Sequence, residues 1–426
     1  MDQPRKRPPS PDLIPNPLIK KRNLDWSLDS PASHRPISPP PVSKPAAAPA
    51  STTTSTTAQI EAGAVQISDH LARFSSSLSS HLRPTSAGVP RLSVARYARL
   101  YESCAGSPGG AHFVVHQHDH PVAGTHYDLR LQINETSSVS WAVMYGLPGD
   151  ANSSRLSRNA TETRIHCLWA SPLSSSSPDT GSLLIWDTGT YSVLPRRSKH
   201  APPDDPSSPP AAAPAASPSP PSSPQQHSPP PPQATAQSLL HAAFQTRKIR
   251  LRLHGAKLPD PYVINLRLTK SEDAAGRSRG LRARAKYDDG LDLIEGERKQ
   301  EPSPKRRANH DAPSVSEEHL KQQDAQVRLT NAYTGASNTI GSVYQRRWYL
   351  SLDRRASGFT EKRRRGGHAD PLSGPEPGLC RLSYPFYVRG PQFERSVVTG
   401  RLAEDILRDE GVTGFVPRKG WTPVLK

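Results

Sequence analysis

The chain has 426 residues, but only 34% are hydrophobic and 47 are proline, which excludes a single core that packs the whole chain. Its formal charge of +17 favours a polyanionic partner, nucleic acid first, although a basic disordered protein is the alternative. No apolar run reaches membrane-spanning length and the N-terminus lacks a signal-peptide core, so we expect a soluble intracellular protein with no membrane partner.

Residues 1–88 are rich in Pro, Ser, Ala and Thr, so we expect a largely disordered N-terminal arm. Basic clusters at 5–7 and 20–22 are typical of nuclear-import signals, and we therefore expect a nuclear protein. A weak amphipathic pattern over 58–82 predicts a short docking helix, and residues 92–101 are a second predicted helix.

The most informative stretch is 113–133, FVVHQHDHPVAGTHYDLRLQI. In its second half, polar and apolar residues alternate, which predicts a half-buried strand with an exposed polar row. A second strand is predicted over 113–118, and Pro121 and Gly124 indicate a hairpin turn between the two. The polar row consists of His126, Asp128, Arg130 and Gln132.

The chemistry of this hairpin indicates a metal and phosphate site. An Asp beside a His suits a divalent cation, and Arg130, two residues after Asp128, suits a bound phosphate. The first strand ends in histidines at alternate positions, so a hairpin would bring one of them to the polar row. These histidines are His116, His118 and His120.

Further short strands are predicted on both sides of a Pro/Ser-rich linker. The predicted strands cover 139–144, 158–169, 181–193 with a turn at 187–189, 248–253 followed by a turn at 254–255, 262–268 and 347–352. A helix is predicted over 397–408. Many short strands separated by turn residues indicate an antiparallel barrel or sandwich, interrupted by two low-complexity insertions.

The predicted organisation has six parts. They are a disordered arm (1–88), a first barrel part (89–194), a linker (195–235), a barrel continuation (236–269), a charged disordered insertion (270–340), and a last barrel strand with a C-terminal extension (341–426). We expect that extension to pack on the barrel.

Six sequence blocks in this order resemble the 3′-phosphoesterase domain of DNA ligase D. They are F-V-V-x-x-H at 113–118, H-Y-D-L-R-L at 126–131, S-W-A-V at 140–143, R-x7-H at 158–166, I-W-D-x-G at 185–189 and L-x-G-x-K-L at 253–258. The resemblance implies an all-β fold, a small closed antiparallel β-barrel. It also implies an enzyme that removes 3′-terminal ribonucleosides and 3′-phosphates from DNA with a divalent metal, Mn²⁺ by family likeness. The donor types alone do not exclude zinc or cobalt.

The resemblance also implies residue roles. His126 and Asp128 match metal ligands, together with His118 or His120; we prefer His118, because a hairpin turn absorbs insertions more easily than a strand shifts register. Arg130 and Arg158 match phosphate-binding arginines, and His166 matches a catalytic histidine, as a general acid or a transition-state donor.

Some positions depart from the family pattern. Tyr145 stands where a lysine is expected, Arg164 where an acidic residue is expected, and Ala170 where an aromatic residue is expected. A non-catalytic DNA-end-binding module that recruits repair partners is therefore the alternative, and a phosphoesterase acting on RNA or a nucleotide is a third hypothesis. No ligase or polymerase module is visible in the sequence, so we expect another protein to supply that activity.

Overall fold

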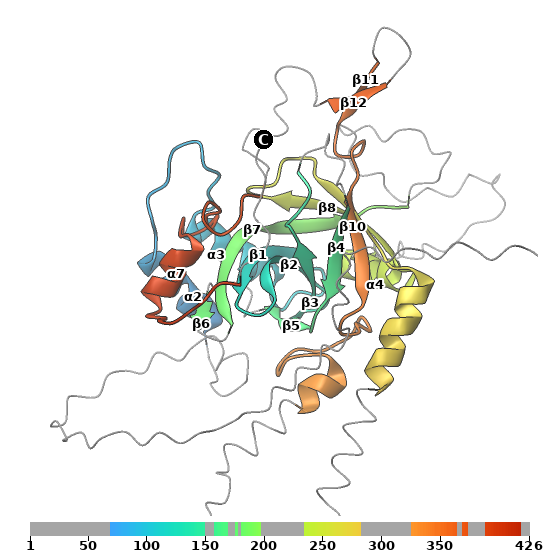
Figure 1. Ribbon diagram of the computed structural model, residues 1–426, viewed down its shortest axis with the longest axis horizontal. Coiled ribbons are helices and arrows are strands. Elements are labelled where there is room, and N and C mark those ends of the chain that lie inside the picture. Colours follow the sequence, from blue (N-terminus) through green and yellow to red (C-terminus); the bar gives the residue numbers. More distant parts are fainter. Residues whose placement is uncertain are drawn as a thin grey trace, which may run out of the picture. The chain divides into compact units, whose positions relative to one another are not determined.

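The computed structural model describes residues 69–149, 157–168, 175–177, 180–196, 234–282, 325–363, 369–373 and 388–418 (Figure 1). Eight antiparallel strands form a closed barrel, which confirms the predicted fold class. Among the described residues, no helix is both long and apolar enough to cross a membrane. The basic clusters of the N-terminal arm and Cys380 lie outside the described residues.

The strands follow one another around the barrel, and the last pairs with the first. In this order they are β1 (His112–His120), β2 (Gly124–Gln132), β3 (Ser137–Met144), β4 (Ser157–Glu162), β10 (Arg347–Leu352), β9 (Val263–Arg267), β8 (Lys248–Gly255) and β7 (Gly181–Val193). Pairing between β7 and β1 closes the ring. Outside the ring, β5 (His166–Cys167) pairs with β3, β6 (Ser175–Ser177) pairs with β7, and β11 (Thr360–Arg363) pairs with β12 (Ala369–Ser373).

Alternation along the strands separates the barrel interior from its outer face. On β2, the residues Tyr127, Leu129 and Leu131 are fully buried in the main hydrophobic core. Trp141 of β3 and Trp348 of β10 join them, with ring centroids 5.9 Å apart. Because neighbouring residues on a strand point to opposite faces, the polar row of β2 lies on the outer face.

Two helices cover part of this outer face, and a third contributes to the barrel core. α2 (His70–Ser80) and α3 (Val94–Cys104) begin at Asp69 and Ser93, whose side chains accept backbone N–H groups of the first turn. They bury Phe74, Tyr97 and other apolar residues against Val114 of β1. α4 (Ala236–Gln245) instead adds Phe244 to the barrel core.

The helix predicted over 58–82 is present as α2, so the end of the N-terminal arm is ordered. Arg91, which precedes α3, donates hydrogen bonds to Arg83 O, at 3.1 Å, and to Val398 O, at 2.9 Å. Within the expected charged insertion, residues 270–282 and 325–330 are helical. They are held although they contain few apolar residues, because buried polar contacts such as Asp273 to Arg346, at 2.6 Å, tie them to the barrel.

The turn predicted at 187–189 is wrong, because β7 runs without a break from Gly181 to Val193. The alternation changes there because of a β-bulge. Val115 of β1 pairs with Asp187 while His116 pairs with Ile185, so Trp186 is the extra residue. The turn predicted at 254–255 is also wrong, since both residues belong to β8.

The bulge aims Asp187 at the loop that follows β8. Its carboxylate accepts the backbone N–H groups of Ala256 and Lys257 at 2.9 Å, and that of Leu258 at 2.8 Å. A Cβ atom at Gly255 would lie 2.1 Å from Asp187 Oδ2, so only glycine allows this approach. The sequence blocks at 185–189 and 253–258 therefore meet in one place.

Two further predicted elements differ in extent. The strand predicted over 158–169 is divided into β4 and β5, and between them Ile165 forms a bridge with Ala332. The C-terminal helix is shorter than predicted, α7 (Ala403–Asp409). Val388 and Ile406 are buried in the main core cluster, so the C-terminal segment packs on the barrel as expected.

Candidate metal and phosphate site

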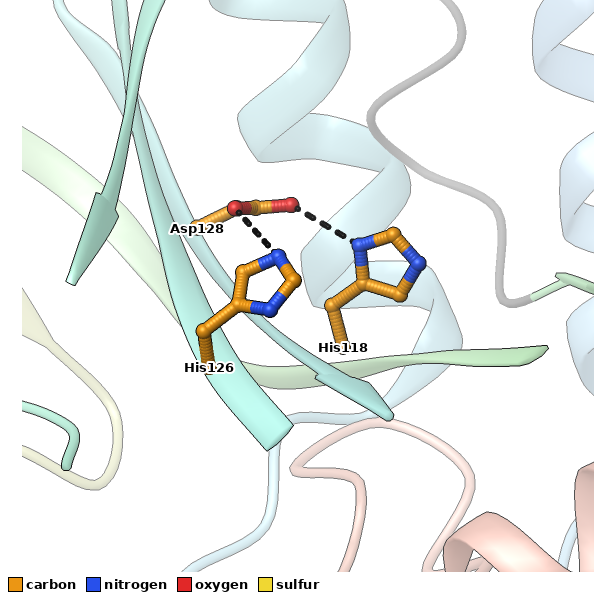
Figure 2. Close-up of side chains that lie close together, drawn as sticks. All are labelled: His118, His126 and Asp128. Carbon is orange, nitrogen blue, oxygen red and sulfur yellow. Dashed lines mark ion pairs between the residues drawn. The ribbon is translucent and has the colours of Figure 1, made fainter. Parts of the chain in front are cut away.

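Three side chains meet on the outer face of the β1–β2 hairpin: His118, His126 and Asp128. His118 and His126 are directly opposite each other in the strand register. Figure 2 shows the Asp128 carboxylate facing both imidazoles, with Oδ2 3.4 Å from His118 Nδ1 and Oδ1 3.5 Å from His126 Nε2. One nitrogen or oxygen atom from each residue lies within 4.8 Å of the others. The two oxygen–nitrogen separations suit a common ion bound at about 2.1 Å.

The remaining ring nitrogens point to backbone carbonyls. His118 Nε2 lies 2.8 Å from Thr180 O, and His126 Nδ1 lies 2.8 Å from Gly124 O. Since a carbonyl oxygen only accepts, each of these nitrogens carries the proton when the ring is neutral. The lone pairs of His118 Nδ1 and His126 Nε2 then face Asp128, as in metal sites where the second nitrogen of a ligand is held by a carbonyl. The donors therefore fit a divalent cation.

Electrostatics keep the carboxylate charged. Burial by itself would raise the pKa of Asp128, but His126, His118 and Arg130 together outweigh burial and lower it. Burial also lowers the pKa of His126, whereas for His118 the hydrogen bond and charge of Asp128 overcome burial and raise the pKa. The carboxylate is thus ionised, as a cation requires, whereas His118 would have to release a proton from Nδ1 to bind a cation.

His120 does not belong to this cluster. Its Nδ1 accepts the backbone N–H groups of Val122 at 3.0 Å and Ala123 at 3.1 Å, so it is engaged in the hairpin turn. The geometry thus favours His118 over His120 as the third ligand, in agreement with the preference from the sequence.

Arg130 is the next polar residue of the row; it is buried, and it forms no direct ion pair with a described residue. Only 4% of its surface is exposed, and its Nε and Nη1 have no hydrogen-bond partner among the described residues. Directly opposite on β3 lies Ser140, whose buried Oγ also lacks a partner within the described part of the chain. Buried polar groups are normally paired, and arginine pairs readily with phosphate. The two residues therefore offer a set of donors for an anion beside the cation site.

The expectation that the polar row is exposed is wrong. His126, Asp128 and Arg130 are all less than 10% exposed. Val114, which is opposite Arg130 on β1, packs against Tyr97 of α3 and Val398 of the C-terminal segment. These remote parts of the chain cover the outer face beside the row.

His166 lies on the same outer face, further from the hairpin. It is opposite Ser138 of β3, which is itself opposite Gln132 of β2. Its ring packs on Tyr333, with centroids 4.8 Å apart, and it is 9% exposed. The structure therefore brings His166 to the row of Arg130 and Gln132 but not into contact with the three candidate ligands.

Arg158 has a different position. On β4 it has the same parity as the buried Ala160, and its Nε donates to Gly146 O at 3.2 Å. Gly146 belongs to the turn after β3, whose last residue Met144 pairs with His126. The hydrogen bond to Gly146 thus places the Arg158 side chain at the end of the barrel where the hairpin lies.

The departures from the family pattern lie around the same site. Tyr145, in that turn, has a positive φ of 65° and is 45% exposed. The Arg164 guanidinium lies over the Tyr344 ring, 4.7 Å from its centroid. Ala170 lies outside the described residues.

Sequence reasoning missed two contributors to the site, Ser140 and the Thr180 carbonyl. Ser140 was visible in the S-W-A-V block, where alternation already placed it on the face of Ala142 opposite Asp128. The Thr180 contact had no signal, because backbone carbonyls are present at every residue.

Comparison with protein families gives a match over residues 116–266, from β1 to β9, to the model described as the DNA Ligase D 3′-phosphoesterase domain. The matched segment contains the hairpin, Arg158, His166 and the loop held by Asp187, so the predicted resemblance is confirmed there. No match was found among curated proteins.

Proposed function

Residues 116–266 carry a domain of the DNA ligase D 3′-phosphoesterase family, and from this premise we propose that the protein is a metal-dependent enzyme that trims 3′ ends of DNA. The proposed substrates are DNA ends that carry a 3′-ribonucleoside or a 3′-phosphate. We further propose that it acts in the nucleus during end repair, before a ligase or polymerase supplied by another protein. The basic balance of the chain, +17, supports a nucleic-acid substrate.

The observation that carries this proposal is the buried pair Arg130 and Ser140 next to the carboxylate–imidazole cluster. A buried guanidinium with no carboxylate partner destabilises a fold unless a ligand neutralises it. Arg130 is two residues after Asp128 on the same face of β2, so its unpaired N–H groups can bind a phosphate beside the cation. Such a cost is typical of a functional site rather than of a structural one.

In the proposed mechanism, His118 Nδ1, His126 Nε2 and an Asp128 oxygen hold a divalent cation, for which we propose Mn²⁺. When bound, the cation polarises a phosphoryl oxygen as a Lewis acid. Arg130 donates to the non-bridging oxygens and offsets the charge that develops on them, and the Ser140 hydroxyl donates beside it. These groups are preorganised by strand pairing, so little ordering is needed when substrate binds.

His166 and Arg158 have supporting roles in this proposal. His166, on the same face, donates a proton to the transition state or to the leaving group. Arg158 donates a hydrogen bond to the Gly146 carbonyl and so holds the turn beside His126. We propose that it positions this turn and binds the substrate phosphate.

A primer–template assay tests the proposal. Purified protein with Mn²⁺ is incubated with duplexes that end in a 3′-ribonucleotide or a 3′-phosphate, beside the variants Asp128→Ala and Glu135→Ala. Glu135 is an exposed carboxylate in the turn after β2 and is the matched control. We expect shortening or dephosphorylation by the wild type and by Glu135→Ala, and none by Asp128→Ala.

The alternative function is a DNA-end-binding module without catalysis. Tyr145 and Arg164 favour it, because both replace residues expected in the phosphate-binding part of the family pattern. Retained DNA binding with no product under Mn²⁺, Mg²⁺, Co²⁺ or Zn²⁺ would support this module and reject the enzyme. Turnover of RNA ends but not of DNA ends would support the third hypothesis.

A further inference from the structure

Tyr97 of helix α3 covers the side of the candidate anion site that faces β1. Its side chain is fully buried and belongs, with Val114 of β1, to the apolar cluster on the outer face of the barrel. Val114 lies directly opposite Arg130 of β2 and, on its other side, directly opposite Thr188 of β7. Residues opposite each other on neighbouring strands are about 5 Å apart, so Tyr97 lies over the outer face beside Arg130.

The Tyr97 hydroxyl is a buried polar group without a partner. No described residue forms a hydrogen bond with it, Thr188 included. The Thr188 hydroxyl donates instead to Phe113 O at 2.8 Å, and its Oγ1 lies 3.0 Å from His112 Nε2. Buried hydroxyl groups are normally paired, and one that is left unpaired costs stability. We therefore expect a ligand atom to lie beside this hydroxyl.

The charge around the hydroxyl favours an anion as that ligand. Burial and Tyr101 raise the pKa of Tyr97, although Thr188 and the positive charge of Arg130 act against them. The hydroxyl thus stays protonated at neutral pH and can donate a hydrogen bond beside the guanidinium. Arg130 Nε and Nη1 and Ser140 Oγ are likewise buried without a partner among the described residues. Helix α3 and strands β2 and β3 therefore present unpaired donors at neighbouring positions of one face.

We propose that Tyr97 is a phosphate-binding residue, whose hydroxyl donates to an oxygen of the phosphate that Arg130 and Ser140 bind. This inference rests on the proposed function and adds helix α3 to the site. The candidate cation site lies along β2 from Arg130, and Tyr97 lies toward β1, so the phosphate is held from two directions. Tyr97 precedes the matched segment, which begins at residue 116, and the family match therefore does not assign it.

The affinity for inorganic sulfate tests Tyr97 without turnover. Sulfate is a stable dianion with the shape of phosphate, and isothermal titration calorimetry in the presence of Mn²⁺ measures its binding. Tyr97→Phe removes the hydroxyl and keeps the ring. Tyr101→Phe is the matched control, because Tyr101 lies one turn later on α3 and its ring also packs on Phe74, with centroids 4.9 Å apart. We expect sulfate to bind about tenfold more weakly or worse to Tyr97→Phe, since a hydrogen bond to a charged group is lost, and unchanged to Tyr101→Phe.

Thermal unfolding distinguishes ligand binding from a structural role of the hydroxyl. Without sulfate, Tyr97→Phe should unfold at the wild-type temperature or above it, because the substitution breaks no hydrogen bond within the described residues. With added sulfate, the midpoint should rise more for the wild type than for Tyr97→Phe, since the ligand stabilises the form that binds it more tightly. A midpoint that Tyr97→Phe lowers equally with and without sulfate would make the hydroxyl structural and overturn the inference.

Turnover separates this inference from the proposed function. On a 3′-phosphate primer–template with Mn²⁺, kcat/KM of Tyr97→Phe should fall about tenfold or more. Combined with Arg130→Met, its effect should be smaller than in the wild-type background, because both residues bind one phosphate. Equal sulfate affinity of Tyr97→Phe and the wild type would overturn the inference. If the wild type turns nothing over but Tyr97→Phe still loses sulfate affinity, the proposed function fails and Tyr97 remains an anion-binding residue.

Discussion

His118 and His126 lie directly opposite each other across the hairpin, with their ring centroids 4.7 Å apart. Two imidazoles this close repel each other when both are protonated, and His118 contributes to the lowered pKa of His126. Asp128 and the carbonyls of Thr180 and Gly124 hold both rings with one nitrogen turned toward a common point. The hairpin is thus arranged around a positive charge that the side chains themselves do not provide.

Removal of His118 should weaken Mn²⁺ binding about a hundredfold or more, because a nitrogen ligand is lost. His120→Ala should change the affinity by less than about threefold, because the His120 ring serves the turn. Isothermal titration calorimetry with Mn²⁺ measures both values. The opposite ranking would make His120 the third ligand.

Arg130→Met should lower activity and raise stability at the same time. The variant removes a buried guanidinium whose Nε and Nη1 have no partner among the described residues, so we expect the free energy of unfolding to increase by about 1–3 kcal/mol. kcat/KM for a 3′-phosphate substrate should fall about 100-fold or more, because a transition-state donor is lost. Urea unfolding and steady-state kinetics check the two effects. Unchanged activity would remove Arg130 from the phosphate site, and Arg99→Met, on an exposed helix position, should change neither quantity.

Glu162→Gln should destabilise the barrel by about 1–3 kcal/mol, since it weakens the charge-assisted hydrogen bonds to the buried Arg346 and leaves Asp273 as its remaining carboxylate partner. The pair lies inside the fold, with Arg346 Nε 2.7 Å from Glu162 Oε2, and Trp348 Nε1 donates to the same oxygen at 3.0 Å. Adding Arg346→Met to the first variant should recover part of the loss. Chemical denaturation measures both; a loss below about 1 kcal/mol for the single variant would contradict a buried, water-excluded pair.

The free energy of unfolding should decrease in acid because His112 is buried in its neutral form. Burial lowers its pKa to about 4 from 6.5, so the folded protein resists protonation while the unfolded chain accepts it. Its contribution is complete above pH 6.5 and is lost as the pH falls toward 4, about 2 kcal/mol between pH 7 and pH 5. The variant His112→Gln should show a flatter dependence of the free energy of unfolding on pH in this window. Parallel pH profiles of the two proteins would refute the assignment.

Tyr145→Lys should lower the KM for a 3′-phosphate substrate. It places a positive charge in the turn after β3, next to His126, where the family pattern has a lysine, and lysine binds phosphate as a point charge. We expect KM for the 3′-phosphate substrate to fall about threefold or more at low salt, and the gain to shrink as salt screens the charge. Tyr145→Phe is the matched control and should leave KM unchanged. A loss of activity with lysine would instead show that the aromatic ring takes part in substrate binding.

The hairpin could be predicted because its signals are local. Alternation from His126 to Gln132 and a Pro–Gly turn are enough to define two strands and their shared face. The sequence left His118 and His120 as alternatives, and the register of the folded hairpin places His118 opposite His126.

The burial of the site could not be predicted in the same way. Val114, opposite Arg130, is covered by Tyr97 and Val398, which precede it by 17 residues and follow it by 284, and no sequence pattern connects them. Residues 270–282 contain few apolar side chains, yet Asp273 attaches them to Arg346. Such contacts depend on the final packing, and local propensity is a weak guide to them.

The extra residue in β7 has a consequence for insertions and deletions in this strand. The Thr180 carbonyl that holds His118 precedes the bulge, and Asp187, which holds the loop after β8, follows it. Deleting one residue between them would exchange inward and outward positions over residues 181–186. Substitutions in residues 181–186 keep the strand register, whereas a change in the number of residues would displace either His118 or the loop after β8. The geometry of this strand therefore depends on the number of residues between Thr180 and Asp187 more than on their side chains.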